Sequence, residues 1–377
     1  MCKNNPQKVI SINNFDFKSI LLGCQFREKA TWKDYARLFI YHDLSVIQTT
    51  DDLSITSDLN RGSYEEMFNN VAKYSKTKKI TFTSKDVKIR ISFFSMYKAI
   101  KIYSKLPKQF VSNPLVTISF IVYAINSIKS LKVKRTQSPS RVICFMPLHG
   151  IESIVAQYVR IKGGRVDMYQ HALFKNDNAL KGIDKIIFDV NNFIYVDRIL
   201  LWGMATYNEM KKYLPDRKLK IAGSLYKING FNSNRIIESK SILLLLTSDV
   251  YYHWNKSLVD YILDCYSDYN IFVKVHPNSN YSDERVEILS KDMSLQDAID
   301  ASKCLFAISV NSSAYYDMYR LGVRCFKYEV GEIRKLDSVI ESDSIRDDMY
   351  RIENEIESFS GINEKLEYFY SKKRDYS

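Results

Sequence analysis

The sequence predicts an α/β protein in which two Rossmann-like domains face a cleft. From residue 141 onward, apolar runs of strand length alternate with runs of helical period. A polar, turn-rich stretch at 226–240 interrupts this alternation, and a second series of the same kind follows it. Alternating strands and helices form parallel sheets with right-handed crossovers, so each series predicts one parallel sheet covered by helices.

The first series predicts four strands and two helices. Apolar β-type runs place the strands at 141–148, 164–171, 197–203 and 220–224. Helical periodicity between them places the helices at 152–161 and 206–213. We therefore assign residues 1–225 to an N-terminal domain and residues 226–240 to a linker.

The second series begins directly after the linker. Its apolar runs predict strands at 241–247, 271–275, 304–309 and 323–328. Its helical runs lie at 256–266, 295–302 and 313–321. We assign residues 241–377 to a C-terminal domain, with the alternative that its last helices pack back on the first domain.

The first 140 residues give a less regular pattern. Runs at 19–24 and 44–49 suggest strands, whereas 64–74 and 93–104 suggest helices, the second of them basic. The order of these elements in a sheet does not follow from the sequence.

Composition is that of an ordinary globular protein, with 46% hydrophobic and 26% charged residues. The six cysteines are scattered without a CxxC spacing, and several lie in apolar runs, so we expect buried thiols in a reducing, cytosolic compartment. The opening residues carry no apolar segment behind their basic ones, which predicts no signal peptide.

The net charge of +12 is concentrated in the first part of the chain. Residues 71–140 hold 15 Lys and Arg but a single acid, Asp86. Such a segment suits an anionic lipid surface or an acidic glycan, or is simply a solvated basic face. No nucleic-acid-binding motif accompanies the charge, so we expect no nucleic acid partner. The apolar stretch from Pro114 to Ile128 is too short to span a bilayer, and we expect it to dock on lipid together with the basic segment.

The pair His276-Pro277 follows a predicted strand that ends near Lys274. Proline stops the strand and holds the imidazole at the edge of the sheet, where ligands of α/β proteins collect. A histidine there can donate a hydrogen bond to a phosphate oxygen, and Lys274 adds positive charge. The alternative is a histidine that only caps a turn.

A second polar turn, Ser309-Val-Asn-Ser-Ser, follows the strand predicted at 304–309. Asn311 or Ser312 can cap the next helix, whose free N–H groups form an anion site. The Ser312 and Ser313 hydroxyls supplement these groups, and Asp317, one turn later, suits a ribose hydroxyl. The alternative is an ordinary helix cap. Together the two turns predict a phosphate-bearing ligand.

These two turns resemble those of bacterial GT-B-type surface-polysaccharide glycosyltransferases: sialyltransferases, polysialyltransferases and capsule Kdo transferases. The chain is also similar to glycerol- and ribitol-phosphate transferases. In these families the HP histidine and the serine pair contact the donor phosphate, which implies His276, Ser312 and Ser313. The segment Leu201-Trp-Gly-Met-Ala-Thr and the residues around Gly223 and Ser224 resemble the end of their first domain, and we count that pair among donor-binding residues.

The resemblance also implies a general base in the first domain, which takes the proton of the acceptor hydroxyl. In sialyltransferase-like families an acidic residue near a glycine is this base, which favours Glu152. The acid-acid-glycine triplet of those families is absent from this sequence. His149 and His171 are the other candidates, and His171 lies in Gln-His-Ala where related enzymes have Gln-His-Gly. Each has the alternative of a structural role. His42-Asp43 and His253 are weaker candidates.

We expect no cofactor and no metal, because neither a strand-terminal Asp-x-Asp nor a zinc-type His/Cys spacing is present. The expected function is transfer of sialic acid or Kdo from a CMP-sugar, with inversion, to a glycan or glycolipid acceptor. The expected location is cytoplasmic, peripheral on the inner face of the cytoplasmic membrane. Alternatives are a CDP-glycerol or CDP-ribitol polyol-phosphate transferase and a non-catalytic nucleotide-sugar or glycan-binding protein.

Overall fold

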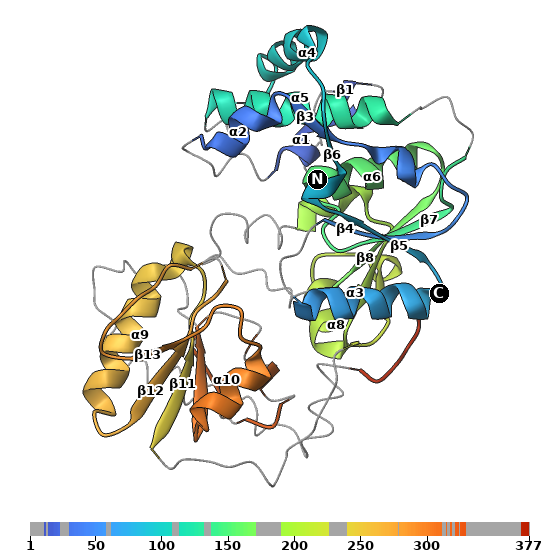
Figure 1. Cartoon of the computed structure of the whole chain (residues 1–377). Helices are drawn as coiled ribbons and strands as arrows, with labels where there is room; N and C mark the ends of the chain where they lie inside the picture. The colour runs from blue at the N-terminus through green and yellow to red at the C-terminus, as the bar shows by residue number, and fades with distance from the viewer. Residues whose placement is uncertain are drawn as a thin grey trace, which may run out of the picture.

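The computed structural model describes most of the chain, namely residues 11–12, 14–22, 30–57, 62–107, 113–131, 137–170, 190–225, 240–277, 279–310, 314, 317–318, 321–323, 325–328 and 371–376. Two parallel sheets with helices on their faces dominate these residues (Figure 1). The predicted α/β class with two Rossmann-like units is thereby confirmed. The predicted linker, apart from Lys240, lies outside the described residues.

The first sheet has six parallel strands in the order β10-β9-β8-β7-β4-β5. They are β4 (Leu53–Ser57), β5 (Lys78–Phe82), β7 (Arg141–Cys144), β8 (Arg165–Tyr169), β9 (Arg198–Leu201) and β10 (Leu219–Ile221). The strands and helices predicted from 141 to 309 and the strand predicted at 323–328 are confirmed in type, whereas most of the helix predicted at 313–321 lies outside the described residues. Strands predicted at 19–24 and 44–49 are wrong, because the described parts of these runs form the helical turns α1 (Phe17–Ile20) and Leu44–Ile47.

Helices cover both faces of this sheet, as its apolar strands require. They are α3 (Gly62–Ser75), α6 (Gly150–Ile161) and α8 (Met204–Lys211). Successive residues of β7 point to opposite faces. Cys144 packs in the cluster of α6, whereas Ile143 packs in the cluster of α3. Ile199 and Leu201 of β9 pack with α8 residue Met210.

Residues 371–376 lie on the α3 face of the first sheet, although they follow the second sheet in the chain (Figure 1). Ser371 donates its N–H to the carbonyl of Trp202, and Asp375 donates to that of Ala222. The buried Tyr376 donates its hydroxyl to the carbonyl of Gly223 at 2.8 Å. The end of the chain thus completes the core of the first unit.

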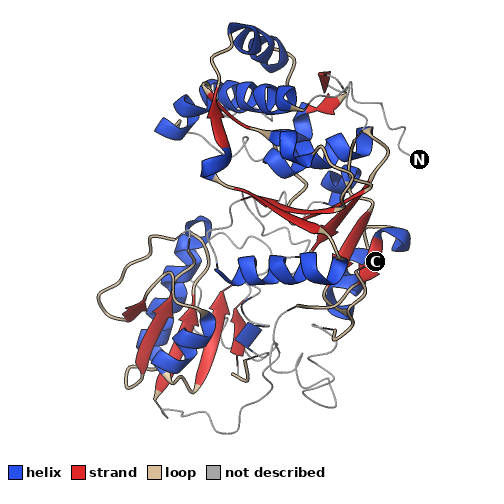
Figure 2. Cartoon of the chain, turned by 45° about the vertical axis from the view of Figure 1, so that its right-hand side comes forward, coloured by secondary structure: helices blue, strands red, loops and turns tan. Residues whose placement is uncertain are grey.

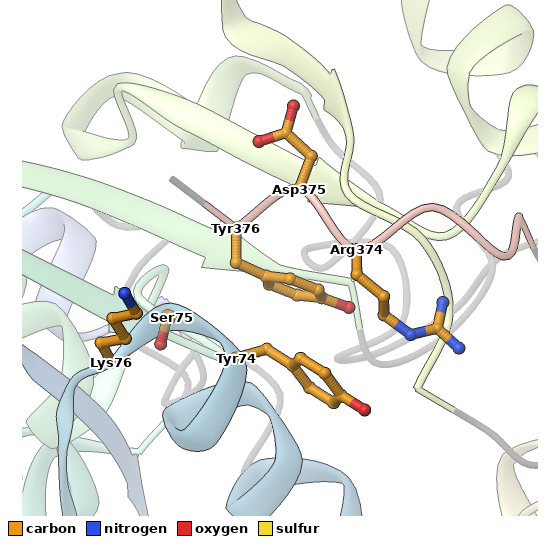
Figure 3. Close-up of a pocket in the computed structure, with 6 residues that line it drawn as sticks. All are labelled: Tyr74, Ser75, Lys76, Arg374, Asp375 and Tyr376. Carbon is orange, nitrogen blue, oxygen red and sulfur yellow. The ribbon is translucent and has the colours of Figure 1, made fainter.

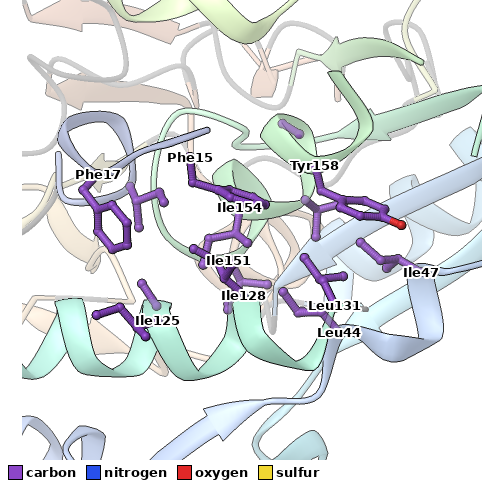
Figure 4. Packing of buried hydrophobic residues seen from close by; sticks show 14 of the residues in the cluster. Phe15, Phe17, Leu44, Ile47, Ile125, Ile128, Leu131, Ile151, Ile154 and Tyr158 are labelled. Carbon is purple, nitrogen blue, oxygen red and sulfur yellow. The ribbon is translucent and has the colours of Figure 1, made fainter. Parts of the chain in front are cut away.

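A helical layer with two small antiparallel ribbons, β1-β2 and β3-β6, lies beyond α6. It comprises β1 (Ser11–Ile12), β2 (Phe15–Asp16), α2 (Trp32–Arg37), β3 (Ile40–His42), β6 (Val87–Ile89), α4 (Phe93–Tyr103) and α5 (Pro114–Ser130). In the core Ile125 and Ile128 of α5 lie close to Ile151 and Ile154 of α6 (Figure 4).

The position of α5 corrects the expectation that the Pro114–Ile128 stretch docks on lipid. Ten of its residues are buried, because α2, α4 and α6 pack around it. Its apolar side chains therefore serve the core. No helix among the described residues is both long enough and apolar enough to cross a membrane.

The second sheet has five parallel strands in the order β13-β12-β11-β14-β15. They are β11 (Ser241–Leu245), β12 (Asn270–Lys274), β13 (Glu287–Leu289), β14 (Phe306–Val310) and β15 (Cys325–Tyr328). The helices α9 (Tyr252–Cys265) and α10 (Leu295–Ser302) cover its two faces through separate clusters. β13 extends the sheet beyond the four predicted strands.

Gly223 offers a test of the docked carboxyl-terminal segment. Its φ is +96°, and a Cβ built there would lie 1.7 Å from the carbonyl oxygen of Lys373. Gly163 is a matched control, since its φ is +83° but no atom lies within 4 Å of its Cβ position. Gly163→Ala should cost about 1–3 kcal/mol of unfolding free energy through φ alone. Gly223→Ala should cost clearly more and expose the segment to carboxypeptidase. Equal losses in urea denaturation would contradict this packing.

Candidate functional site

The carboxyl ends of all six strands of the first sheet lie at one edge, because the strands are parallel. In open α/β sheets this edge is where ligands bind. The loop after β7 carries His149 and leads into α6, so the candidates His149 and Glu152 both lie here.

Glu152 joins the ends of two neighbouring strands. One carboxylate oxygen accepts from the N–H of Ser57 at 2.9 Å and from its hydroxyl at 3.0 Å. The other oxygen accepts from the N–H of Met146 at 2.6 Å. Ser57 ends β4 and Met146 follows β7, so one side chain fixes both turns.

The environment of Glu152 is almost dry, since only 2% of the residue is exposed. Burial raises the pKa of this carboxyl, and the hydrogen bonds from Met146 and Ser57 oppose the rise. Both oxygens are already engaged with the protein. Its observed contacts are those of a residue that shapes the edge, and its role as general base remains a prediction.

His149 stands at the start of α6, three residues before Glu152, and is partly exposed. Its backbone is extended, and Gly150 follows with a φ of +62°, a conformation that favours glycine. Burial lowers the pKa of His149 to about 4, so the imidazole is neutral at pH 7. A neutral imidazole can accept a proton. The third candidate, His171, lies outside the described residues.

Gln170 is a buried polar residue of this edge that the sequence analysis did not single out. Its side-chain oxygen accepts from the N–H of Trp202 at 2.8 Å, and its amide donates to the hydroxyl of Thr206 at 2.8 Å. It links the end of β8 to the start of α8. Its place in the Tyr-Gln-His run that ends a predicted strand was the available signal.

Gly223 and Ser224 make their observed contacts with the protein. Gly223 donates its N–H to the carbonyl of Leu201, and Ser224 donates to that of Ser371. Ser224 is 1% exposed. Both residues contact the carboxyl-terminal segment, and their role in donor binding remains a prediction.

The second sheet brings its candidates to one edge as well. β12 and β14 lie on either side of β11, so His276 and Val310, the last residue of β14, lie at strand ends that are two strands apart. With strands ~4.8 Å apart, these strand ends are separated by about 10 Å. One phosphate-bearing ligand can span that distance.

His276 is partly buried, and its carbonyl accepts from the N–H of Ser279 at 2.8 Å, while Pro277 is exposed. Lys274 is 9% exposed, and its amino group donates to the carbonyls of Ser290 at 3.3 Å and Lys291 at 3.0 Å. The lysine thus also fixes the loop after β13 at this edge. Its role in donor binding remains a prediction.

The other donor-site candidates follow β14. Asp317 is helical and partly buried, and its carbonyl accepts from the N–H of Leu321. Asn311, Ser312 and Ser313 lie outside the described residues. Their predicted contacts therefore rest on the sequence and on the position of Val310 at the strand end.

Of the weaker candidates, His42 and Asp43 lie in the helical layer, whereas His253 lies at the start of α9, shortly after the carboxyl end of β11. His42 belongs to the β3–β6 ribbon, where one ring nitrogen pairs with the Tyr123 hydroxyl and the other lies 3.0 Å from the Thr83 carbonyl. Burial lowers its pKa. Asp43 pairs with Lys88. His42 and Asp43 thus serve the helical layer, and His253 is exposed on α9.

A pocket of about 280 Å³ lies between the end of α3 and the carboxyl-terminal segment (Figure 3). Its lining residues are Tyr74, Ser75, Lys76, Arg374, Asp375 and Tyr376. The rings of Tyr74 and Tyr376 stack with their centroids 6.1 Å apart. None of the predicted site residues lines it.

Within the described ranges, no group of three or more His, Cys, Asp or Glu side chains is placed to hold a metal ion.

No protein-family model matches the chain, and no curated protein matches its sequence. Solved structures resemble it in fold at low identity. The UDP-GlcNAc 2-epimerase of Neisseria meningitidis bound to UDP-GlcNAc is 11% identical with a TM-score of 0.46, covering 85% of this chain and 95% of that one. S. aureus MnaA with UDP is 12% identical with a TM-score of 0.46, covering 87% and 93%. The wall teichoic acid polymerase TagF is 10% identical with a TM-score of 0.39, covering 88% and 87%.

Glu152→Gln tests whether this carboxylate shapes the edge. An amide offers one acceptor oxygen and places an NH₂ group against a backbone N–H, so a buried donor loses its partner. We expect a loss of about 1–3 kcal/mol in unfolding free energy, measured by urea denaturation. The control Glu209→Gln, at a partly exposed acid paired with Lys212, should change stability by about 0.5 kcal/mol or less. Unchanged stability of Glu152→Gln would contradict the structural role.

His149 predicts a pH dependence of stability. Its folded pKa of about 4 lies below the value of 6.5 for a free histidine. Between these values the unfolded state binds more protons, so stability rises with pH and falls as pH drops from 6.5 towards 4. The loss should reach at most about 3 kcal/mol, from 1.36 kcal/mol per pKa unit. Comparing wild type with His149→Gln by denaturation from pH 4 to 7 should show a shallower dependence in the variant. Equal pH dependence of stability in wild type and variant would refute this role of His149.

Proposed function

We propose that the chain is a glycosyltransferase of GT-B type that takes its sugar from a nucleotide-activated donor. The observation that carries this proposal is the strand order β12-β11-β14, because His276 and Val310, the last residue of β14, thereby lie at the same edge of the sheet. The His276-Pro277 turn and the polar turn predicted after Val310 would then suit one phosphate-bearing ligand.

The second unit would bind the leaving nucleotide. His276 would donate a hydrogen bond to the donor phosphate, and Asn311, Ser312 and Ser313 would add donors from the start of the next helix. Lys274 supplies positive charge beneath this edge, and Asp317 would accept from a ribose hydroxyl. Negative charge grows on the phosphate oxygen as the sugar leaves, so these donors act most strongly in the transition state.

The first unit would present the acceptor. The acceptor oxygen attacks the anomeric carbon on the face opposite the nucleotide, the bond from that carbon to the phosphate oxygen breaks, and a base takes the hydroxyl proton. We favour His149 or His171 as this base, because the oxygens of Glu152 already accept hydrogen bonds from Ser57 and Met146. Glu152 then holds the loop on which His149 stands.

The finer proposal is a CMP-activated acidic sugar, sialic acid or Kdo, transferred with inversion to a surface glycan or glycolipid. A leaving group with one phosphate needs fewer positive partners than a diphosphate, which suits a site built from histidine, hydroxyl and N–H donors. We propose that no metal takes part.

Nucleotide binding to His276→Ala tests the site directly. A hydrogen bond to a charged group contributes about 1.5–3 kcal/mol, so the Kd for CMP should rise roughly 10- to 100-fold. Lys240→Ala is the control, since this exposed lysine directly precedes β11 and so lies at the opposite edge of the second sheet. Calorimetry with CMP, CDP, UDP and GDP would measure both the effect and the base preference.

The proposal of a donor site is overturned if none of the four nucleotides binds, or if His276→Ala binds them like wild type and like Lys240→Ala. Binding of CMP without turnover of any CMP-sugar would favour a non-catalytic binding protein. Preference for CDP with turnover of a CDP-alcohol would favour polyol-phosphate transfer.

A further inference from the structure

The outer side of α4 and the strand that leads into it form an exposed apolar surface. Its side chains include some of the most exposed large apolar residues in the described chain. We call the set the α4 surface: Ile89, Ile91, Phe93, Phe94, Tyr97 and Ile100, which are between 56% and 82% exposed. A protein rarely exposes such a contiguous set unless a partner covers it.

α4 is apolar on two sides. Its inner side packs against α5 through Ala99 and Ile102, which are buried. Its outer side carries Phe93, Tyr97 and Ile100, spaced four and three residues apart on one helical stripe. A helix with a single partner needs only the inner stripe, so the outer stripe is explained by a second apolar environment.

The outer stripe is held in place by polar contacts on the inner side. The buried Ser95 donates to the side-chain oxygen of Asn126 at 2.6 Å, and Lys129 donates to Ser95 at 2.8 Å. The strand before α4 is fixed where Arg90 donates its N–H to the carbonyl of Phe39 at 2.6 Å. Both views place α4 on the side of α5 that faces away from the six-stranded sheet (Figures 1 and 2).

Positive charge surrounds the α4 surface. The ammonium groups of Lys98 and Lys129 lie 4.5 and 4.9 Å from the centroid of the Phe94 ring. Burial lowers the pKa of Lys129, and the positive charges of Arg90 and Lys98 lower it further. Lys101 is exposed on the same helix.

The acids near this surface leave that charge largely uncompensated. Asp43 pairs with Lys88, and Asp34 pairs with Arg37. Asp86 accepts from the N–H and hydroxyl of Thr83. α4 itself contains no acid. The partner that fits an apolar stripe with a basic border is apolar and anionic at once.

We propose that the α4 surface docks in the headgroup region of a bilayer that contains anionic lipids. The apolar stripe would enter the boundary between headgroups and acyl chains, with Tyr97 at the interface that aromatic side chains prefer. Lys98, Lys101, Lys129 and Arg90 would pair with lipid phosphates. A second copy of the surface would bring like charges together, which disfavours a dimer through this face.

Vesicle flotation of the full-length protein tests the proposal, with vesicles of phosphatidylcholine alone or mixed with phosphatidylglycerol. We expect binding to the mixed vesicles that weakens with salt, because charge attraction is screened over about 10 Å at 0.1 M. Combined Phe93→Ser, Tyr97→Ser and Ile100→Ser should weaken binding at least about tenfold. Combined Lys98→Glu and Lys101→Glu should do the same.

Matched controls lie elsewhere on the first unit. Ile194→Ser removes an isoleucine that is 58% exposed, and Lys211→Glu with Lys212→Glu reverses two exposed lysines at the carboxyl end of α8. Both variants should bind vesicles like wild type. All variants should keep the melting temperature and the CMP affinity of wild type, which separates this proposal from that of the donor site.

A fluorescent reporter can locate the contact. The chain has three tryptophans, and Trp202 and Trp254 are each only 2% exposed. Trp32→Phe combined with Phe93→Trp leaves one exposed tryptophan, at the centre of the α4 surface. Its emission should shift to the blue with mixed vesicles and be quenched by brominated lipids.

The proposal is overturned if wild type does not float with anionic vesicles, if the α4 variants bind as wild type does, or if the reporter is not quenched. A dimer in light scattering, without vesicle binding, would also overturn it if the combined Phe93→Ser, Tyr97→Ser and Ile100→Ser variant is a monomer. A second copy of the chain would then cover the α4 surface.

Discussion

The arrangement of the first unit depends on one buried carboxylate. Glu152 accepts hydrogen bonds from residues at the ends of β4 and β7, two strands that a helix-rich excursion of more than 80 residues separates in the chain. An acid is costly to bury unless its oxygens are satisfied, and here three donors satisfy them. The same bonds fix the turn that carries His149, so the stability of this edge and the position of the candidate base have one origin.

A second charged centre ties the strands at the opposite end of the sheet. Asp167 of β8 accepts from Arg141 of β7 at 2.7 Å and from Arg198 of β9 at 3.0 Å. Arg141 also donates to the carbonyl of Tyr376 at 2.5 Å, which links the end of the chain to this centre. Breaking such a buried pair leaves an uncompensated charge. The Asp167 centre thus ties the strands together at the edge opposite the candidate site.

Much of the fold could be predicted from periodicity. The helices at 64–74 and 93–104 and the strand and helix types from 141 to 302 were predicted and observed. The short strands that contain polar residues were not predicted. β4 and β5, which add two strands to the first sheet, contain serine, threonine and lysine, and only their neighbours in the sheet make them strands. Conversely, the apolar run of α5 suggested a surface function, but packing by three helices turned it into core.

The sequence alone determined the class of fold, the polar turns after two apolar strands and the basic character of residues 71–140, because these properties are local. Tertiary structure decided which residues meet. It placed β12 and β14 on either side of β11 and packed the carboxyl-terminal segment against Gly223 and Ser224. It also left the side chains of α4 exposed and buried those of α5. Strand order and burial depend on contacts between distant segments, which periodicity along the chain does not encode.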